Sequence, residues 1–527
     1  MFTAPACDAL RNAQPAETSR AMNHLLTFPH HRHRTVGEGL IARQRWQWTV
    51  LGVVLIGATM SALDISIVNI ALPTIKDEFD VRLSVVEWVS IAYMIVLAIS
   101  LPIVGRLADI YGRSLLYNIG FGIFVVGSAL CGLAPDAVFL IIARALQAIG
   151  AGLLQANSVA LITQVFRSKQ LGRALGIQAA TQATAMALGP FIGAVLVAWV
   201  GWRAIFYVNV PIGIVGGLAA HFVLPRYHPS AGRAKIDYPG IVLFTVALMG
   251  LSVGVNRAET EGWYSLAVLA ELTLGLVCLG LFAIAEHRTK SPMIDLGLFH
   301  HYRLVVGNVT AFLAYYALFA VLFLLPFYFE QVLGYSTLLS GVLLMPVPAS
   351  MAVLAPFAGA ACDRFGARNL TLAGSLMLMT GTAMLIVTST VRHPALLIAA
   401  MVILGAGLGL FTPANNRATM AATPRDKLGV MGGLLNMMRS LGLIFGIDIS
   451  GMLFITIAQL EAGTMTTHHN ASRALAFLSK PAFMDGLHGV MISLVAVASL
   501  AAVFSWFRRP EEASKPAPAH HEPIELM

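Results

Sequence analysis

Charged side chains are scarce in this chain. Asp, Glu, Lys and Arg together make up 11% of its 527 residues, whereas hydrophobic residues make up 57%. An ordinary soluble protein carries about 25% charged residues, so this chain has too few charges to be solvated in water. The composition excludes a soluble enzyme, a disordered protein and a nucleic-acid-binding protein. It predicts an all-α polytopic membrane protein.

Cysteine is also rare, and the dipeptide Gly-Lys does not occur. The four cysteines, Cys7, Cys131, Cys278 and Cys362, are far apart, so neither a disulfide framework nor a zinc site is indicated. Without Gly-Lys there is no P-loop for nucleotide phosphates. We therefore expect no cofactor, no metal and no enzymatic activity. An ion gradient, by default of protons, is the expected energy source.

Fourteen segments are long and apolar enough to cross a bilayer, which takes about 20 residues each. With the N-terminus in the cytoplasm, 25 of the 34 Lys and Arg residues fall in cytoplasmic segments and 7 outside, while Arg144 and Arg439 fall within spans. This bias follows the positive-inside rule and predicts that both termini are cytoplasmic. The segments are about 47–73, 85–105, 115–133, 137–164, 174–199, 204–225, 238–256, 263–285, 304–329, 338–360, 370–390, 394–416, 429–459 and 486–507.

One loop motif occurs twice. Residues 102–113 contain Pro, Gly, Asp and Gly at the same spacing as residues 356–366, with an offset of 254. We expect a tight turn with two glycines, whose Asp accepts hydrogen bonds from the N-terminus of the next helix and pairs with nearby arginines. Two unrelated charged loops are the alternative. Duplicated halves are typical of secondary transporters, whose substrate site lies between the halves.

The repeat suggests a six-two-six arrangement of the spans. We expect a disordered basic tail at 1–46, a six-helix bundle at 47–225, and a linker with two extra helices at 226–303. A second six-helix bundle follows at 304–507, and a disordered tail at 508–527.

Several motifs resemble those of one transporter family. Residues 105–113 (GRLADIYGR) resemble the signature loop of the major facilitator superfamily, with Ile110 where a basic residue is usual. Residues 189–194 (GPFIGA) resemble the fifth-helix motif of drug:proton antiporters, with Ala194 in place of glycine. Residues 63–73 and 144–152 resemble motifs of the first and fourth helices of these antiporters, and 202–211 and 328–334 resemble runs of their 14-helix branch, the EmrB/QacA-type multidrug exporters.

The resemblance implies a major facilitator fold with two six-helix bundles plus two extra helices. It implies a proton-coupled antiporter that exports amphipathic drugs or toxic compounds by alternating access across a bacterial inner membrane. The alternative is a facilitator of narrow specificity that exports a single metabolite. The expected partners are small amphipathic substrates, protons and the lipid bilayer, not nucleic acid, and a periplasmic adaptor protein is a candidate.

Two ionisable side chains inside spans are the first candidates for the mechanism, because charges there are costly and rare. Asp64 lies among apolar residues of the first span, where we expect it to exchange a proton or to attract a cationic substrate. Arg144, in the fourth span, needs a counter-charge, and Asp64 is the natural candidate. A static structural pair is the alternative.

Three further sets of residues are candidates for gating, helix packing and the cavity. The gating loops contain Gly105, Asp109, Gly112, Arg113, Asp363 and Gly366. The antiporter motif contains Gly189, Pro190 and Gly193, a small-residue stripe with a proline kink that should bring helices close together rather than bind substrate. The candidates for a cavity lining are Gln178, Gln182, Glu330, Asn415 and Asn416, for which hydrogen bonding between helices is the alternative.

The orientation can be tested by thiol labelling. Cysteine introduced at Gly262 or Thr466 should react with an impermeant thiol reagent applied from outside the cell, because both positions fall in predicted external segments. Cysteine at Ser230 should not react. Labelling with the opposite pattern would contradict the orientation derived from the charge bias.

Overall fold

The structure is a computed structural model. It describes residues 36–81, 83–166, 168–225, 237–262, 264–289, 292, 294, 296–391, 393–461 and 480–508. The expectations for most of the two tails, and for Ser230 and Thr466, lie outside these residues. The chain divides into two units, residues 1–48 and 49–527, and the description below concerns the second.

The described residues form helices joined by short turns, and fourteen of the helical segments are long and apolar enough to span a membrane. The all-α, fourteen-span prediction is therefore confirmed. The first group of helices comprises α2 (Val36–Ile67), η1 (Val68–Ile70), α3 (Leu72–Phe79), α4 (Leu83–Tyr111), α5 (Arg113–Gly132), α6 (Ala137–Val165), α7 (Ser168–Trp199), α8 (Ala204–Tyr207) and α9 (Asn209–Val223). We call these the N-terminal helices.

Two long helices follow, α10 (Tyr238–Glu261) and α11 (Leu266–Arg288), and then the short η2 (Leu296–His300). The remaining elements, which we call the C-terminal helices, are α12 (Tyr302–Phe327), the π-helical turn η3 (Tyr328–Val332), α13 (Thr337–Leu344), α14 (Pro346–Phe365), α15 (Ala367–Val391), α16 (Pro394–Ala421), η4 (Arg425–Lys427), α17 (Leu428–Glu461) and α19 (Lys480–Trp506).

The span predicted over 338–360 is confirmed as the membrane-spanning segment Leu339–Cys362, but a turn at Met345 divides it into two helices, which the sequence analysis did not anticipate. The chain leaves α13 at Leu344, and α14 begins at Pro346. Pro346 and Pro348 have no backbone N–H, so neither can donate the hydrogen bond that would continue α13. The break matters for function because residues on both sides of it line the central cavity described below.

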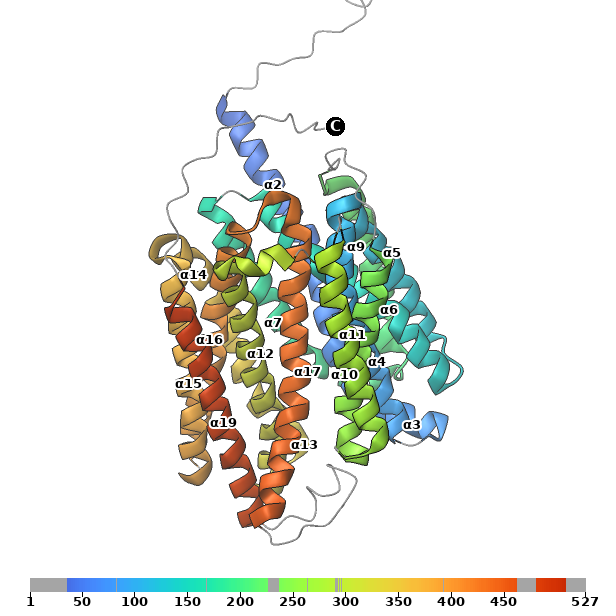
Figure 1. Cartoon of the computed structure of the whole chain (residues 1–527), viewed down its shortest axis with the longest axis vertical. Helices are drawn as coiled ribbons and strands as arrows, with labels where there is room; N and C mark the ends of the chain where they lie inside the picture. The colour runs from blue at the N-terminus through green and yellow to red at the C-terminus, as the bar shows by residue number, and fades with distance from the viewer. Residues whose placement is uncertain are drawn as a thin grey trace, which may run out of the picture. The chain divides into compact units, whose positions relative to one another are not determined.

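The extra pair α10 and α11 pack on each other as a hairpin, and α10 also lies against α4 and α17 (Figure 1). Arg257 of α10 and Glu271 of α11 form an ion pair at 2.5 Å. Many large apolar side chains of α11 are exposed, among them Leu269, Leu274 and Leu276. A membrane would cover such a surface with lipid.

The N-terminal and C-terminal helices meet through α4 on α17 and α7 on α14. Glycines on both sides bring the backbones into close contact. A Cβ atom added at Gly105 would collide with the carbonyl of Gly429, and one added at Gly359 would collide with the carbonyl of Gly172. These contacts lie at the end of the bundle that carries residues 105–113, which we call the loop end. The loop end is therefore closed by packed backbone.

Substitution of Gly359 should weaken this closure. Gly359→Ala should separate α7 from α14, since overpacking costs about 1–3 kcal/mol. Tyr111 and Phe365 are exposed at equivalent positions of the repeat. The distance between spin labels at these two positions, measured by pulsed electron paramagnetic resonance, should then show an additional population at longer distance.

The matched control is Gly280→Ala on α11, where an added Cβ meets no atom within 4 Å. The control should leave the distance distribution unchanged. An unchanged distribution in Gly359→Ala would show that this contact does not hold the loop end closed.

Candidate functional site

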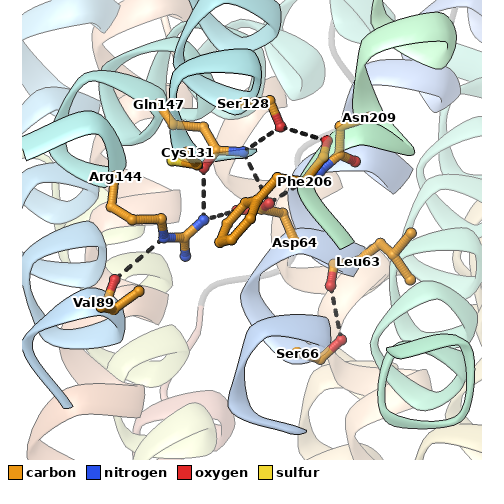
Figure 2. A network of polar contacts seen from close by, with 10 residues as sticks. All are labelled: Leu63, Asp64, Ser66, Val89, Ser128, Cys131, Arg144, Gln147, Phe206 and Asn209. Atoms are coloured by element: carbon orange, nitrogen blue, oxygen red, sulfur yellow. Dashed lines mark hydrogen bonds and ion pairs between the residues drawn. The ribbon is translucent and has the colours of Figure 1, made fainter. Parts of the chain in front are cut away.

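A buried ion pair lies at the centre of the N-terminal helices. Nη1 of Arg144, on α6, lies 2.5 Å from Oδ2 of Asp64, on α2, and the two side chains are 1% and 0% exposed (Figure 2). The contact expected from the sequence is thus confirmed. Because the other groups that contact the pair are neutral, each charge is compensated mainly by the other.

Neutral polar groups make the remaining hydrogen bonds of Asp64 and Arg144. Oδ1 of Asp64 accepts hydrogen bonds from Nε2 of Gln147 at 2.9 Å and Nδ2 of Asn209 at 3.1 Å. Nη1 of Arg144 also donates to Oε1 of Gln147 at 2.7 Å, and its guanidinium lies 3.9 Å from the centre of the Tyr93 ring. Figure 2 shows Asp64 of α2, Arg144 and Gln147 of α6, and Asn209 of α9 converging on one point. The network therefore locks several helices together through one carboxylate.

Gln147 and Asn209 are parts of this site that we did not single out from the sequence. Gln147 follows Arg144 by three residues and so shares its face of the helix, which is a signal that could have been used. Asn209 begins α9, 145 residues after Asp64, and no pattern in the sequence brings the two together. Two polar atoms around the pair, the hydroxyl oxygen of Tyr93 and Oδ1 of Asn209, are buried without a hydrogen-bond partner.

A cavity of about 750 Å³ lies between the N-terminal and C-terminal helices. Its size is within the range typical of pockets for drug-sized ligands. Its wall is mainly apolar and includes Ala62 and Ile65 of α2 and Pro190 of α7. The residues of α7 and α14 that line it lie beyond the glycine contacts of the loop end, so the cavity is on the opposite side of that closure.

Of the five residues proposed for the cavity lining, only Gln182 lies there. The other four are corrections, because hydrogen bonds between and within helices, or solvent, take up their polar groups. Gln178 donates to Ser158 at 2.8 Å, and Asn415 donates to the carbonyl of Gly307 at 2.9 Å. Asn416 accepts from Arg439, and Glu330 is exposed on η3.

The loop motif makes a contact that the sequence did not predict. Oδ1 and Oδ2 of Asp109 accept hydrogen bonds from the backbone N–H groups of Gly429 and Val430, at 2.8 and 2.9 Å. These groups open α17, not the helix that follows the loop, so the expected partner was wrong. The predicted pairing with Arg113 is confirmed at 2.8 Å. Asp109 therefore joins the N-terminal to the C-terminal helices at the loop end.

The glycines of the two loops have the conformation that the tight turn requires. Gly112 has φ 101° and Gly366 has φ 80°, a region that disfavours residues with a Cβ. The side chain of Asp363 lies outside the described part of the structure.

The fifth-helix motif packs α7 against α2. A Cβ atom at Gly189 would collide with Ser66, and one at Gly193 would lie 2.9 Å from the carbonyl oxygen of Ile67. Pro190, between them, faces the cavity. These glycines contact the end of the helix that holds Asp64.

Comparisons with known proteins agree with this architecture. The sequence profile of the Major Facilitator Superfamily matches residues 54–447. The riboflavin transporter RibZ of Clostridioides difficile is 35% identical over 76% of this chain and 86% of its own length. The multidrug resistance protein Stp of Mycobacterium tuberculosis is 31% identical over 86% of this chain and 91% of its own length.

A solved structure shows the same fold. The proton:xylose symporter XylE superposes with a TM-score of 0.61 over 89% of this chain and 97% of its own, at 14% sequence identity. Similarity to resistance proteins such as Stp is consistent with the drug:proton antiporter branch that the motifs resemble. The profile match covers most of the chain, and the described helices include fourteen that can span a membrane. This chain is a multi-pass membrane protein and belongs to the Major Facilitator Superfamily of transporters.

Proposed function

We propose that this protein is a proton-coupled antiporter that exports amphipathic compounds from the cytoplasm by alternating access between two six-helix bundles, residues 47–225 and 304–507. The observation that carries the proposal is the sealed pair of Asp64 and Arg144, held on a helix that also lines the central cavity.

Asp64 is the group proposed to carry the proton. Asp64 accepts two hydrogen bonds at Oδ1 and one at Oδ2, so one of its roughly four lone-pair sites, on Oδ2, remains for a proton. Protonation there would remove the negative charge that compensates Arg144. The new O–H group would then need an acceptor. Oδ1 of Asn209 is buried without a partner, and rotation of that amide would turn an acceptor toward Asp64. Protonation would thus be tied to a rearrangement of α2, α6 and α9.

The link from proton to cargo runs through α2. Asp64 is fully buried and does not line the cavity, whereas Ala62 and Ile65 do. Cargo and proton would therefore compete through movement of the helix. Direct contact of the cargo with the carboxylate, which the sequence had suggested, is not part of this proposal. The packing of Gly189 and Gly193 on the end of α2 would transmit the same movement to α7.

The closed loop end supports alternating access. With the orientation predicted from the charge bias, this end faces the cytoplasm and the cavity lies on its outer side. Asp109, bonded to the N-terminus of α17 and to Arg113, would act as a latch. Cytoplasmic opening requires those bonds and the glycine contacts to separate.

Two relatives support different cargo ranges. Stp bears the name of a multidrug resistance protein and RibZ that of a riboflavin transporter, so a narrow exporter of a single metabolite remains the second candidate. Growth of null and overexpressing strains across a panel of dyes and antibiotics separates the two, since only a multidrug exporter protects broadly. The relatives named are bacterial, which supports placement in a bacterial cell membrane. If this is an inner membrane, as proposed, a periplasmic adaptor would be a further partner.

Asp64→Asn should abolish uphill export. The amide cannot release a proton, so an imposed pH gradient should drive no accumulation in proteoliposomes, and cargo should release no protons. Because loss of one partner of a buried pair costs about 3–5 kcal/mol, thermal melting should accompany the assay. If the single variant unfolds, the double variant Asp64→Asn, Arg144→Gln is assayed in its place, because it leaves no buried charge without a partner.

Glu271→Gln, in the α10–α11 hairpin, is the control acid and should retain uphill export. Full uphill export by a folded Asp64→Asn protein would eliminate Asp64 as the coupling group. Glu330 of η3 and Asp448, an acidic residue within the membrane-spanning helix α17, would then be the next candidates.

Asp109→Asn should slow transport while leaving cargo affinity within about twofold, because this residue contacts α17 and not the cavity. The amide offers one acceptor in place of two and loses the charge that pairs with Arg113, which weakens closure of the loop end. Asp77→Asn, at an exposed site paired with Lys76, should behave as the unmodified protein. A large loss of affinity in Asp109→Asn with normal folding would contradict the assignment. For Asp363→Asn, a milder effect of the same kind is expected.

A further inference from the structure

Arg439 of α17 lines the cavity and is 9% exposed. Its guanidinium donates to the side-chain oxygens of Asn416 and, at 3.4 Å, Asn436. Its carbon also lies 5.4 Å from the centre of the Tyr315 ring. All three neighbours are neutral. Within the described part of the chain no carboxylate pairs with Arg439, and its buried Nε–H has no acceptor.

Two other buried arginines each have a carboxylate partner. Arg144 is paired with Asp64 and Arg113 with Asp109. An arginine remains protonated in proteins, and a buried charge without a counter-charge is costly. Asp448, nine residues further along α17, forms no ion pair with Arg439. Among the described residues none supplies a counter-charge to Arg439, and the space beside it is the cavity.

The rest of the lining has no charge. Its other polar side chains include Gln155, Gln182 and Ser440, and the large majority of the wall is aliphatic or aromatic. Among the described residues that form the cavity, Arg439 alone is charged. A single positive charge in an apolar wall complements a molecule with one acidic group and a hydrophobic body, and it repels a cation.

We propose that the cavity binds amphipathic organic anions, such as carboxylates or sulfonates, with the acidic group on Arg439 and the apolar body against α7, α12 and α14. This proposal rests on the proposed export function and names its cargo class. It replaces the cationic cargo expected from the position of Asp64, because Asp64 is sealed behind the cavity wall.

Binding of two related probes tests the charge preference. 1-Anilinonaphthalene-8-sulfonate is an anion, and N-phenyl-1-naphthylamine is its neutral analogue without the sulfonate. Affinities are measured by fluorescence in phosphatidylcholine nanodiscs, in which no anionic lipid can compete, with empty nanodiscs as the blank. The sulfonate should bind more tightly than the neutral analogue, by about 10- to 100-fold, the range expected for hydrogen bonds to a charged group.

Three variants test whether Arg439 is the residue that makes the sulfonate bind more tightly than the neutral probe. Arg439→Gln should weaken the affinity for the sulfonate by that same factor and change the affinity for the neutral probe by less than twofold. For Arg439→Lys, the affinity for the sulfonate should lie between those of the unmodified protein and Arg439→Gln. Arg257→Gln, an arginine paired with Glu271 away from the cavity, should change neither. Arg439→Gln should also raise the melting temperature of the probe-free protein, because it removes a buried charge without a partner, whereas a merely structural arginine would lower it.

Equal affinity of the unmodified protein for both probes would overturn the proposal, as would equal weakening of both probes by Arg439→Gln. Adding phosphatidylglycerol to the nanodiscs distinguishes a lipid headgroup from a free anion. Competition with the sulfonate, lost in Arg439→Gln, identifies a lipid anion at the same site.

Transport separates this proposal from the proposed function. If the sulfonate binds selectively but a pH gradient does not drive its uphill movement, the anion site stands and proton-driven export is wrong. If the gradient drives export of the cation rhodamine 6G but not of the sulfonate, export stands and the anion proposal is wrong.

Discussion

One buried carboxylate organises the N-terminal helices. Asp64 is bonded to Arg144 and Gln147 of α6 and to Asn209 of α9, so three helices depend on a single negative charge in an apolar surrounding. A charge in such a place must be fully compensated, and loss of any one bond leaves a buried polar group unsatisfied. The network therefore favours a small number of discrete arrangements over a continuous range. A transporter that must occupy alternate states benefits from that property.

Three polar features are kept apart in the molecule. The sealed pair lies within the N-terminal helices, the latch at Asp109 joins α4 to α17 at the loop end, and Arg439 faces the cavity from the C-terminal helices. We interpret these as the proposed proton site, gate and cargo site. No described side chain belongs to two of them, so the helices that connect them must carry the coupling. Helix α2 is best placed for this, since it holds Asp64 and also contributes to the cavity wall.

The sequence predicted the parts of the structure that depend on local composition. The length of the apolar segments predicted the fourteen spans. The cost of burying an unpaired charge predicted the contact of Asp64 with Arg144. The contact of Asp64 with Arg144 joins segments 80 residues apart, but other contacts between distant segments were not predictable, because no unpaired buried charge points to their partner. Nothing in the loop motif indicates that Asp109 will meet Gly429, 320 residues later. Amides in apolar helices were also ambiguous. Gln178 and Asn415 are as polar as Gln182, but interhelical hydrogen bonds hold them, and only the arrangement of neighbouring helices decides this.

The glycine contacts at the loop end have an evolutionary consequence. Backbone atoms form the seal where Gly105 meets Gly429 and Gly359 meets Gly172, so its fit does not depend on the size or polarity of side chains elsewhere. Cavity residues such as Leu318 or Met351 can then be exchanged without changing how tightly that end shuts. Under the proposed function, recognition of cargo by the cavity and closure of the loop end then depend on different residues, so substitutions that change the cargo need not open this end.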